Sequence, residues 1–305
     1  MRLGIIVNPL HARTHRAHHR LVTLLDRVHV RYRTVSTSAV RPGAEQAREL
    51  ADWGAEAVVV LGGDGTLRAA APALAIADLP TLIIPTGTAN VFSRALGVPN
   101  ARAGLALCEE YLLGAAPTTG VPISLAEGID ADGAHRHEHF LSLAGIGGDA
   151  HAVAGHRRDW GLLGYARGAL GALFAPEMDA RIDGEALRVW SVMGAKAARP
   201  AGPIPVFPGA EVTGEDLEFL AVVLAADSPV SRVGAWAGIG TSCVRGHPER
   251  DENMRYWTAR SARISVAEPA PVHLDGDHLG EFSSLRMSTG DLLLEVVVPA
   301  AHTTD

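Results

Sequence analysis

The first third of the chain alternates short apolar runs with segments of helical spacing, and this alternation restricts the fold more than any other feature. Leu21, Leu24, Leu25 and Val28 recur at the interval of one helix face, between two strand-like runs. Strands that alternate with helices of this length predict a parallel sheet with crossover helices. The expected strands cover residues 2–9, 30–37, 57–61 and 81–87, and the expected helices cover 16–28, 43–53, 66 onward, 89–97 and 101–114.

After Gly120 the pattern changes to short strand-like runs separated by glycine, proline and aspartate turns. Only residues 159–174 and 228–239 keep a helical pattern. Short strands at this spacing are typical of an antiparallel β-sandwich. We therefore expect an α/β fold followed by an all-β fold, with a first domain at 1–120 and a second at 121–288.

The composition of the 305 residues limits the class of protein. Apolar residues make up 47% and charged residues 20%, as in ordinary globular chains, and the net charge of −7 argues against a nucleic-acid partner. No apolar run is long enough to span a bilayer, and the first ten residues resemble a strand rather than a secretory signal. With two cysteines and no CxxC motif, the expected compartment is the cytoplasm.

Fourteen histidines raise the alternative of a metal site, chiefly in the groups at 11–19 and 135–139. Neither group is accompanied by cysteine or by a carboxylate at the spacing of zinc enzymes. The pattern therefore favours an exposed helix face for the first group and a polar hairpin for the second.

The stretch Leu61–Leu67, LGGDGTL, follows a run of valines and contains three glycines in four positions. Glycine costs conformational entropy, so such a loop indicates that another group approaches its backbone. At a strand end, the N–H groups of the loop and the positive end of the following helix suit a nucleotide phosphate. A side chain at Gly63 would occupy the space of the phosphates, and would oppose a positive φ if the loop requires one. The alternative is a tight turn with no ligand.

Several motifs, in sequential order, resemble the diacylglycerol kinase catalytic domain, a family of soluble bacterial lipid kinases with sphingosine-kinase relatives. The glycine loop is followed by Pro85–Asn90, PTGTAN, and then by FSRALGVP. The other matching motifs are Asn8-Pro9, GIGGDA at 145–150, GLLGY at 161–165 and LDGD at 274–277. Each motif alone is weak, but their common order on an α/β-then-β layout is specific.

The resemblance implies a phosphofructokinase-like and NAD kinase-like α/β domain that binds ATP and Mg²⁺, a β-sandwich domain for a lipid acceptor, and a cleft between the two. By analogy, residues from about 289 to 305 return to the first domain. The residues that the resemblance assigns to the nucleotide are Asn8, Thr37, Gly62, Gly63, Asp64, Gly65, Thr66, Thr88 and Asn90. Those that it assigns to metal are Asp64, Asp149, Glu215 and Asp216.

The resemblance also assigns the base that acts on the acceptor hydroxyl to Asp275, with Asp277 beside it. Phosphoryl transfer needs a carboxylate that orients the attacking hydroxyl. On an extended segment, residues two apart point to one side, so both carboxylates would face the same site. The alternative is an Asp-Gly hairpin turn, since LDGDHLGE also has good turn chemistry.

The chain departs from the family pattern in three places, one of which is the Asn-Gly pair at the end of the central sandwich strand, which reads Met193-Gly194. The opening NPxSG motif reads NPLHART, and a basic helix start with Arg13, Arg16 and Arg20 either replaces its glycine as a phosphate contact or is a solvated face. The DGxLD segment, which carries a structural Mg²⁺ in several members, reads TGEDLE at 213–218. Whether a second metal site persists is left open by the sequence.

Two other functions also stay open. An NAD kinase shares the GGDGT loop. That family also carries an Asn-Glu pair in the sandwich, and this sequence has no such pair in a corresponding place. A degenerate kinase would bind ATP without transfer. For a lipid kinase the expected partner is a membrane surface reached by peripheral contact, for which 157–163 is either an interfacial helix start or an ordinary core-facing helix. A homodimer is an open alternative to a monomer.

Overall fold

The computed structural model describes residues 1–10, 12–154, 175–200, 202–224 and 228–300. The chain divides into two compact units, Met1–Ile123 with Asp291–Asp305, and Ser124–Gly290. Two long strands, β5 (Thr118–Asp130) and β14 (Asp277–Val297), contribute residues to both units. The predicted helix at 159–174, the GLLGY motif and the proposed membrane contact at 157–163 lie outside the described residues.

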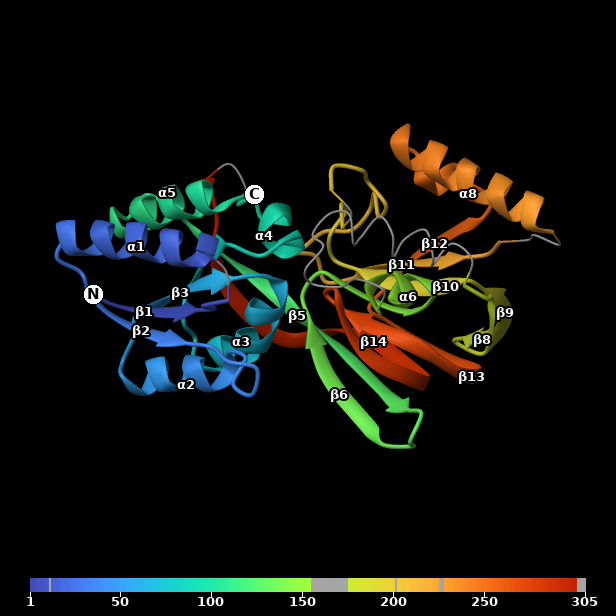
Figure 1. Ribbon diagram of the computed structural model, residues 1–305, viewed down its shortest axis with the longest axis horizontal. Helices are drawn as coiled ribbons and strands as arrows, with labels where there is room; N and C mark the ends of the chain where they lie inside the picture. Colours follow the sequence, from blue (N-terminus) through green and yellow to red (C-terminus); the bar gives the residue numbers. More distant parts are fainter. Residues whose placement is uncertain (11, 155–174, 201, 225–227, 301–305) are drawn as a thin grey trace. The chain divides into compact units, whose positions relative to one another are not determined.

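The first unit contains a parallel sheet covered by helices (Figure 1). Its strands lie in the order β4-β3-β1-β2, and the end of β14 pairs with β4 in parallel. The strands are β1 (Arg2–Val7), β2 (Arg31–Ser36), β3 (Ala57–Gly62) and β4 (Thr81–Pro85). The helices are α1 (Ala12–Arg27), α2 (Ala44–Asp52), α3 (Asp64–Ile76), α4 (Val91–Ala95) and α5 (Ala101–Leu112).

The core of the first unit lies on both faces of this sheet. Figure 1 shows α1 and α5 over one face and α2 and α3 over the other. On the first face, Leu21 and Leu25 of α1 and Leu107 of α5 pack against Ile5 and Val59 of the sheet. β3 and β4 are buried along their whole length, because a parallel sheet with crossover helices is covered on both sides.

The second unit is built on antiparallel strands, whose main order is β12-β11-β10-β7-β13-β14. β5 pairs with β14 and β6, and β8 pairs with β13 and β9. The strands are β6 (His135–Phe140), β7 (Leu143–Gly147), β8 (Met178–Ile182), β9 (Glu185–Val189), β10 (Ser191–Ala195), β11 (Leu217–Val222), β12 (Met254–Ala259) and β13 (Ser261–Leu274). The helices are α6 (Gly148–Ala154), α8 (Pro229–Val244) and the 3-10 turn η2 (Pro248–Arg250).

Among the described residues, two apolar clusters form the core of the second unit. One includes Phe140, Phe219 and Leu285 from the strands, and all three are fully or almost fully buried. The other lies under α8, where Ile239 and Cys243 pack in a cluster with β10 and β11 residues. Ser228 caps α8 through a reciprocal capping box with Ser231, which explains why the helix starts there.

The predicted fold class, an α/β fold followed by an antiparallel β-rich fold, is confirmed. The third helix begins at Asp64 rather than Thr66, because Gly63 is already its N-cap. The strand-like run at 262–268 and the first part of that at 271–277 form a single strand, β13, with a register irregularity between Ser265 and Ala270. Among the described residues, no helix combines the length and apolar character needed to cross a membrane.

The contact between α5 and β4 gives a test of the packing in the first unit. A Cβ added to Gly104 would lie 2.5 Å from the Ile83 carbonyl oxygen and 3.0 Å from the Ile84 Cα, which are backbone atoms. We expect Gly104→Ala to lower the free energy of unfolding by about 1–3 kcal/mol, since overpacking forces the helix away from the strand. Urea unfolding followed by circular dichroism measures this change.

The matched control is Gly240→Ala in α8, where an added Cβ meets no atom within 4 Å. Alanine there should stabilise the protein by up to about 1 kcal/mol, because it has the higher helix propensity. Equal effects of the two substitutions would contradict the close packing of α5 on β4.

Candidate functional site

The carboxyl ends of the four parallel strands meet at one edge of the first unit. The register places Val7 opposite Ser36 and Leu61, and it places Gly62 opposite Pro85. Because the strands are parallel and in step, the residues that follow them lie at the same edge, where ligands of such sheets bind. The structure therefore brings together four predicted stretches, which begin at Asn8, Thr37, Gly63 and Thr86.

The glycine loop joins β3 to α3 and is fastened to the residue that follows β1. Asn8 donates from Nδ2 to Thr66 Oγ1 at 3.0 Å, and from its backbone N–H to the Leu61 carbonyl at 2.9 Å. α3 begins at Asp64, with the N–H of Thr66 donating to the Gly63 carbonyl at 3.1 Å. The first N–H groups of a helix have no partner within the helix, so this end is suited to bind phosphate oxygens.

Gly63 contacts the second predicted loop through its backbone. A Cβ added to Gly63 would lie 3.1 Å from the Gly87 Cα, and a Cβ added to Gly87 would lie 2.6 Å from the Gly63 Cα. Gly63 has φ −102° and ψ −173°, an extended conformation that any residue adopts. The loop therefore needs no positive φ at Gly63, a condition that the sequence had left open. It needs glycine because the two backbones lie against each other.

The second loop positions Asp64 and Asn90. Asp64 Oδ1 accepts the N–H of Phe92, in the first turn of α4, at 3.2 Å. Asn90 has a left-handed φ of 47°, and its Nδ2 donates to the Gly87 carbonyl at 2.9 Å, while its buried Oδ1 has no hydrogen-bond partner within the part of the chain that the structure describes. Since a buried oxygen without a partner is costly, Asn90 is a candidate ligand contact. Thr88, also predicted to contact the nucleotide, is exposed.

A small cavity lies inside the edge that the two loops form. Its volume is about 10 Å³, enough for about one water molecule. The residues that line it include Gly62, Gly63, Asp64, Asn90 and Ser93. A nucleotide would therefore bind over the outer side of the loops and not within this cavity.

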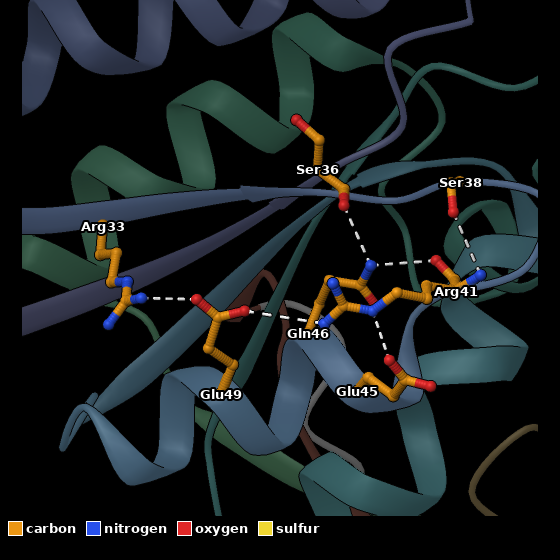
Figure 2. Close-up of polar contacts among 7 residues, drawn as sticks. All are labelled: Arg33, Ser36, Ser38, Arg41, Glu45, Gln46 and Glu49. Carbon is orange, nitrogen blue, oxygen red and sulfur yellow. Dashed lines mark hydrogen bonds and ion pairs between the residues drawn. The ribbon is translucent and has the colours of Figure 1, made fainter.

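Thr37 lies in the connection between β2 and α2, which a network of side chains holds in place (Figure 2). Thr37 is buried, and its N–H donates to the Val7 carbonyl at 2.9 Å. Gln46 donates from Nε2 to the carbonyl oxygens of Ser36 and Arg41, at 2.9 and 3.0 Å. The ion pairs drawn with them are Arg33–Glu49, Arg41–Glu45 and Arg41–Glu49. The network orders the backbone at Thr37, whose predicted contact with the nucleotide stays a prediction.

In the second unit, Asp275 and Gly276 form the two-residue turn between β13 and β14. Both have positive φ, 49° and 84°, as a type I′ hairpin turn requires, and Leu274 pairs with Asp277 across it. The structure therefore shows the hairpin turn that the sequence left as the alternative. The expectation that an extended segment turns both carboxylates to one side is wrong, because the chain reverses between Asp275 and Asp277.

The carboxylate of Asp275 accepts three backbone hydrogen bonds. The donors are Leu141 at 2.9 Å, Ser142 at 2.8 Å and Leu143 at 3.1 Å. The Asp275 N–H in turn donates to the Leu143 carbonyl at 2.8 Å. Hydrogen bonds to a charged acceptor are strong, so Asp275 fastens the turn to the connection between β6 and β7.

Asp149, whose side chain is 12% exposed, belongs to a polar cluster with the buried residues His273 and Ser191. Asp149 Oδ2 lies 2.6 Å from His273 Nε2, and its Oδ1 accepts a hydrogen bond from the Ser191 hydroxyl. Because an ionised carboxylate only accepts hydrogen bonds, His273 Nε2 carries the proton. His273 Nδ1 is buried and has no hydrogen-bond partner among the described residues. Both oxygens of Asp149 therefore already have protein partners, which does not support its predicted role as a metal ligand.

The segment at 213–218 is held by Lys196, the single lysine of the chain. The side chain is fully buried, and its Nζ donates to the carbonyl oxygens of Gly214 and, at 3.3 Å, of Asp216. The Glu215 carboxylate instead pairs with Arg260 at 2.9 Å, on the surface. An ammonium group thus binds the carbonyl oxygens that a cation would need. This arrangement does not support Glu215 and Asp216 as ligands of a second metal ion.

The described residues contain no group of three or more His, Cys, Asp or Glu side chains placed to bind a metal ion. Asp64 lies at the start of α3 beside the glycine loop. One carboxylate together with substrate phosphates is a ligand set that Mg²⁺ accepts, so the residues fit a nucleotide-associated Mg²⁺ at Asp64. They do not fit a second ion at 213–218.

Sequence reasoning missed Ser191, Lys196 and His273. Each is a polar residue within or directly beside an apolar strand: VWSVM for Ser191, VMGAKAA for Lys196 and PVHL for His273. A polar side chain in a buried strand needs a partner, because its burial alone costs free energy. These isolated polar residues are the signal that would have indicated a buried network.

Residues 2–119 match the family model described as the diacylglycerol kinase catalytic domain. These residues belong to the diacylglycerol kinase catalytic-domain family. The match covers β1 to β4 and both loops, so the predicted resemblance is confirmed. The match over residues 2–119 supports a kinase, and ATP is the phosphate donor that such a family implies.

Relatives of known sequence extend the similarity beyond this domain. The chain is 25% identical over 263 residues to a diacylglycerol kinase of Bacillus subtilis, which covers 81% of this chain and 79% of that protein. It is 29% identical over 252 residues to an uncharacterised protein of Synechocystis, which covers 77% of this chain and 54% of that protein. The chain therefore spans about half the length of the Synechocystis relative.

Solved structures support the fold. A crystal structure of a candidate diacylglycerol kinase from Bacillus anthracis superposes with a TM-score of 0.73 at 22% identity, covering 99% of this chain and 98% of that one. Yeast NADH kinase is more distant, with a TM-score of 0.55 at 11% identity, covering 98% of this chain and 84% of that one. At these identities the likeness shows a fold that diacylglycerol kinases and NAD kinases share.

Lys196 should make the stability of the second unit depend on pH in a characteristic way. Burial lowers the pKa of Lys196 from its ordinary 10.5 to about 8, against the opposing influence of Asp216 and Glu211. Between these values the unfolded chain binds more protons than the folded one, so the free energy of unfolding should rise with pH. We expect wild type to gain roughly 2 kcal/mol over Lys196→Met between about pH 8 and pH 10.

Urea unfolding of both proteins at a series of pH values measures this difference. Subtracting the Lys196→Met curve removes the titrations that both proteins share, including those of Cys243 and Tyr256, whose buried groups have raised pKa values. A difference that stays constant across this pH range would show that Lys196 titrates as an ordinary lysine.

Proposed function

We propose that this protein transfers the γ-phosphate of ATP, with Mg²⁺, to the hydroxyl of a lipid, with diacylglycerol as the default acceptor. The observation that carries the proposal is the edge of the first unit, where Asn8, the glycine loop and Asp64 lie together within a diacylglycerol kinase catalytic domain. The similarity to a Bacillus subtilis diacylglycerol kinase supports the choice of acceptor.

The first unit would bind the nucleotide. The N–H groups at the start of α3 would donate to phosphate oxygens, and the positive end of the helix favours their charge. Asn8 and the backbone contact between Gly63 and Gly87 keep the loop in place. Mg²⁺, held by Asp64 and the phosphates, would supply charge neutralisation for the transferred group.

The second unit would supply the base. In the transfer, the acceptor oxygen forms a bond to the γ-phosphorus, the bond to the β–γ bridging oxygen breaks, ADP leaves and the hydroxyl proton passes to a carboxylate. The three backbone hydrogen bonds to Asp275 give that carboxylate a structural role. Within the predicted pair we therefore assign the base to Asp277, with Asp275 holding the turn that positions it.

The acceptor is tested with labelled ATP and a panel of diacylglycerol, sphingosine, ceramide, glycerol and NAD, followed by chromatography. We expect label in the diacylglycerol product, dependent on Mg²⁺. Transfer only to a water-soluble acceptor would end the lipid proposal. Transfer to NAD would instead support the NAD kinase alternative, which the shared fold with yeast NADH kinase keeps open. ATP binding without any transfer would indicate a degenerate kinase.

Substitution of the two carboxylates separates a base from a structural residue. A positioned base contributes about 10²–10⁴-fold, so Asp277→Asn should lower kcat by that factor at near-normal ATP affinity. Asp275→Asn keeps the shape of the side chain but removes the negative charge of the carboxylate, which accepts three backbone hydrogen bonds. It should lower the free energy of unfolding by about 1–3 kcal/mol.

Steady-state kinetics and urea unfolding of both variants are the measurements. Our assignment is wrong if Asp277→Asn keeps wild-type turnover while Asp275→Asn loses turnover at unchanged stability. The two results together also show whether the turn has only a structural role. In that case neither variant would change kcat in the folded protein.

The lipid acceptor implies that the protein reaches a membrane surface by peripheral contact from the cytoplasm, as a monomer or a homodimer. This part of the proposal rests only on the assignment of a lipid as the acceptor. Flotation with phosphatidylcholine vesicles that contain diacylglycerol, with and without anionic lipid, tests the contact. An attraction that depends on basic side chains should weaken as salt is added.

A further inference from the structure

Three arginine side chains gather on the outer face of the second unit's sheet. Arg181 lies on β8, Arg263 on β13 and Arg286 on β14, and all three are exposed. Arg263 is directly opposite Arg286 in the antiparallel register, and Arg181 is opposite Ser265. Together with Ser261 they line an open hollow of about 590 Å³.

This arrangement is unfavourable without a ligand. Side chains directly opposite in an antiparallel pair have Cβ atoms about 4.5–5.5 Å apart, and like charges there destabilise the sheet. The apposition of Arg263 and Arg286 occurs in a chain whose net charge is −7, so carboxylates are not scarce. Repulsion at this place is therefore a local feature that the overall composition does not explain.

The neighbouring acidic groups compensate only in part. Asp183 is the single carboxylate among the described residues that line the hollow, and its Oδ1 accepts the backbone N–H of Arg263 at 2.9 Å. Glu127 lies 3.5 Å from Arg286, in a pair whose side chains are 40% and 45% exposed. Such an exposed pair is weak. Arg181 donates to the Gly184 carbonyl at 3.3 Å, a contact that adds no negative charge.

We propose that this hollow is a binding site for a phosphate monoester. Arginine guanidinium groups match phosphate oxygens in pairs, and the hydroxyl groups of Ser261 and Ser265 add neutral donors. The volume falls in the range of small-molecule sites and exceeds what a bare phosphate fills. The ligand would therefore be an organic phosphate whose anionic group meets the three arginines.

A second hollow of about 520 Å³ adjoins this one and shares Arg181 and Ser265 with it. Its lining combines Leu187, Val266 and three alanines with the charged residues Asp179 and Arg188, so it offers some apolar surface next to the cationic site. The carbon part of a phosphate monoester fits there. Two sources have this chemistry, the headgroup of a phosphatidic acid in a bilayer and a soluble ester such as glycerol 3-phosphate.

The test measures binding to the full chain without ATP, so its outcome is independent of the kinase proposal. Calorimetry with glycerol 3-phosphate and flotation with phosphatidylcholine vesicles, alone or mixed with phosphatidic acid, are the two assays. The variants are Arg263→Gln, Arg286→Gln and the milder Arg286→Lys. The matched control is Arg255→Gln, which removes an exposed arginine from β12 of the same unit but outside the hollow.

Each glutamine substitution in the hollow should weaken binding about tenfold or more, and Arg255→Gln should not. Arg286→Lys keeps the charge but loses the paired donors, so its loss should be smaller. Without ligand, Arg263→Gln should melt at or above the wild-type temperature, because it removes a like-charge pair. If Arg263 served only to stabilise the fold, its replacement would instead lower the melting temperature.

The two assays identify the source of the ligand. Binding to phosphatidic acid vesicles but not to glycerol 3-phosphate assigns the site to a bilayer headgroup, and the reverse result assigns it to a soluble ester. Absence of binding to both probes overturns the proposal, as does binding that the glutamine variants weaken no more than Arg255→Gln does. The melting temperatures of the variants confirm that each protein is folded when it is tested.

Discussion

The backbone contact between Gly63 and Gly87 is the constraint on which the candidate nucleotide site depends. The segments that follow β3 and β4 can approach so closely because both residues lack a side chain. The contact places Asp64 within reach of the Phe92 N–H, and it places Asn90 against the same loop. The shape of this edge therefore follows from backbone proximity and not from an unusual φ at the loop.

The second unit relies on charged side chains that bind backbone atoms. Asp275 accepts three N–H groups, and Lys196 donates to carbonyl oxygens of the 213–218 segment. In both cases a single charge replaces several backbone partners that the irregular chain cannot supply itself. The result is that side chains of the unit itself hold the loops at the ends of its β-strands. The open cationic hollow on the outer face differs, because its charges face solvent and each other.

Much of the fold could be predicted because its signals are local. Apolar periodicity indicated the strands and helices of the first unit, and the glycine loops indicated its edge. The site was predicted less completely. The contact between Asn8 and Thr66 joins residues 58 positions apart, and the cluster of Asp149, Ser191 and His273 joins three strands or their ends. Spacing along the chain carries no information about such partners.

The sequence by itself determined the order of the elements, the two glycine loops and the family, because each depends on residues close together in the chain. Only the tertiary structure showed which backbone groups the Asp275 carboxylate binds. The LDGD motif suits both a base and a turn, and the choice depends on the N–H groups of 141–143, which are far away in sequence. The meeting of Arg181, Arg263 and Arg286 was likewise decided by strand register, a property of paired strands rather than of any one segment.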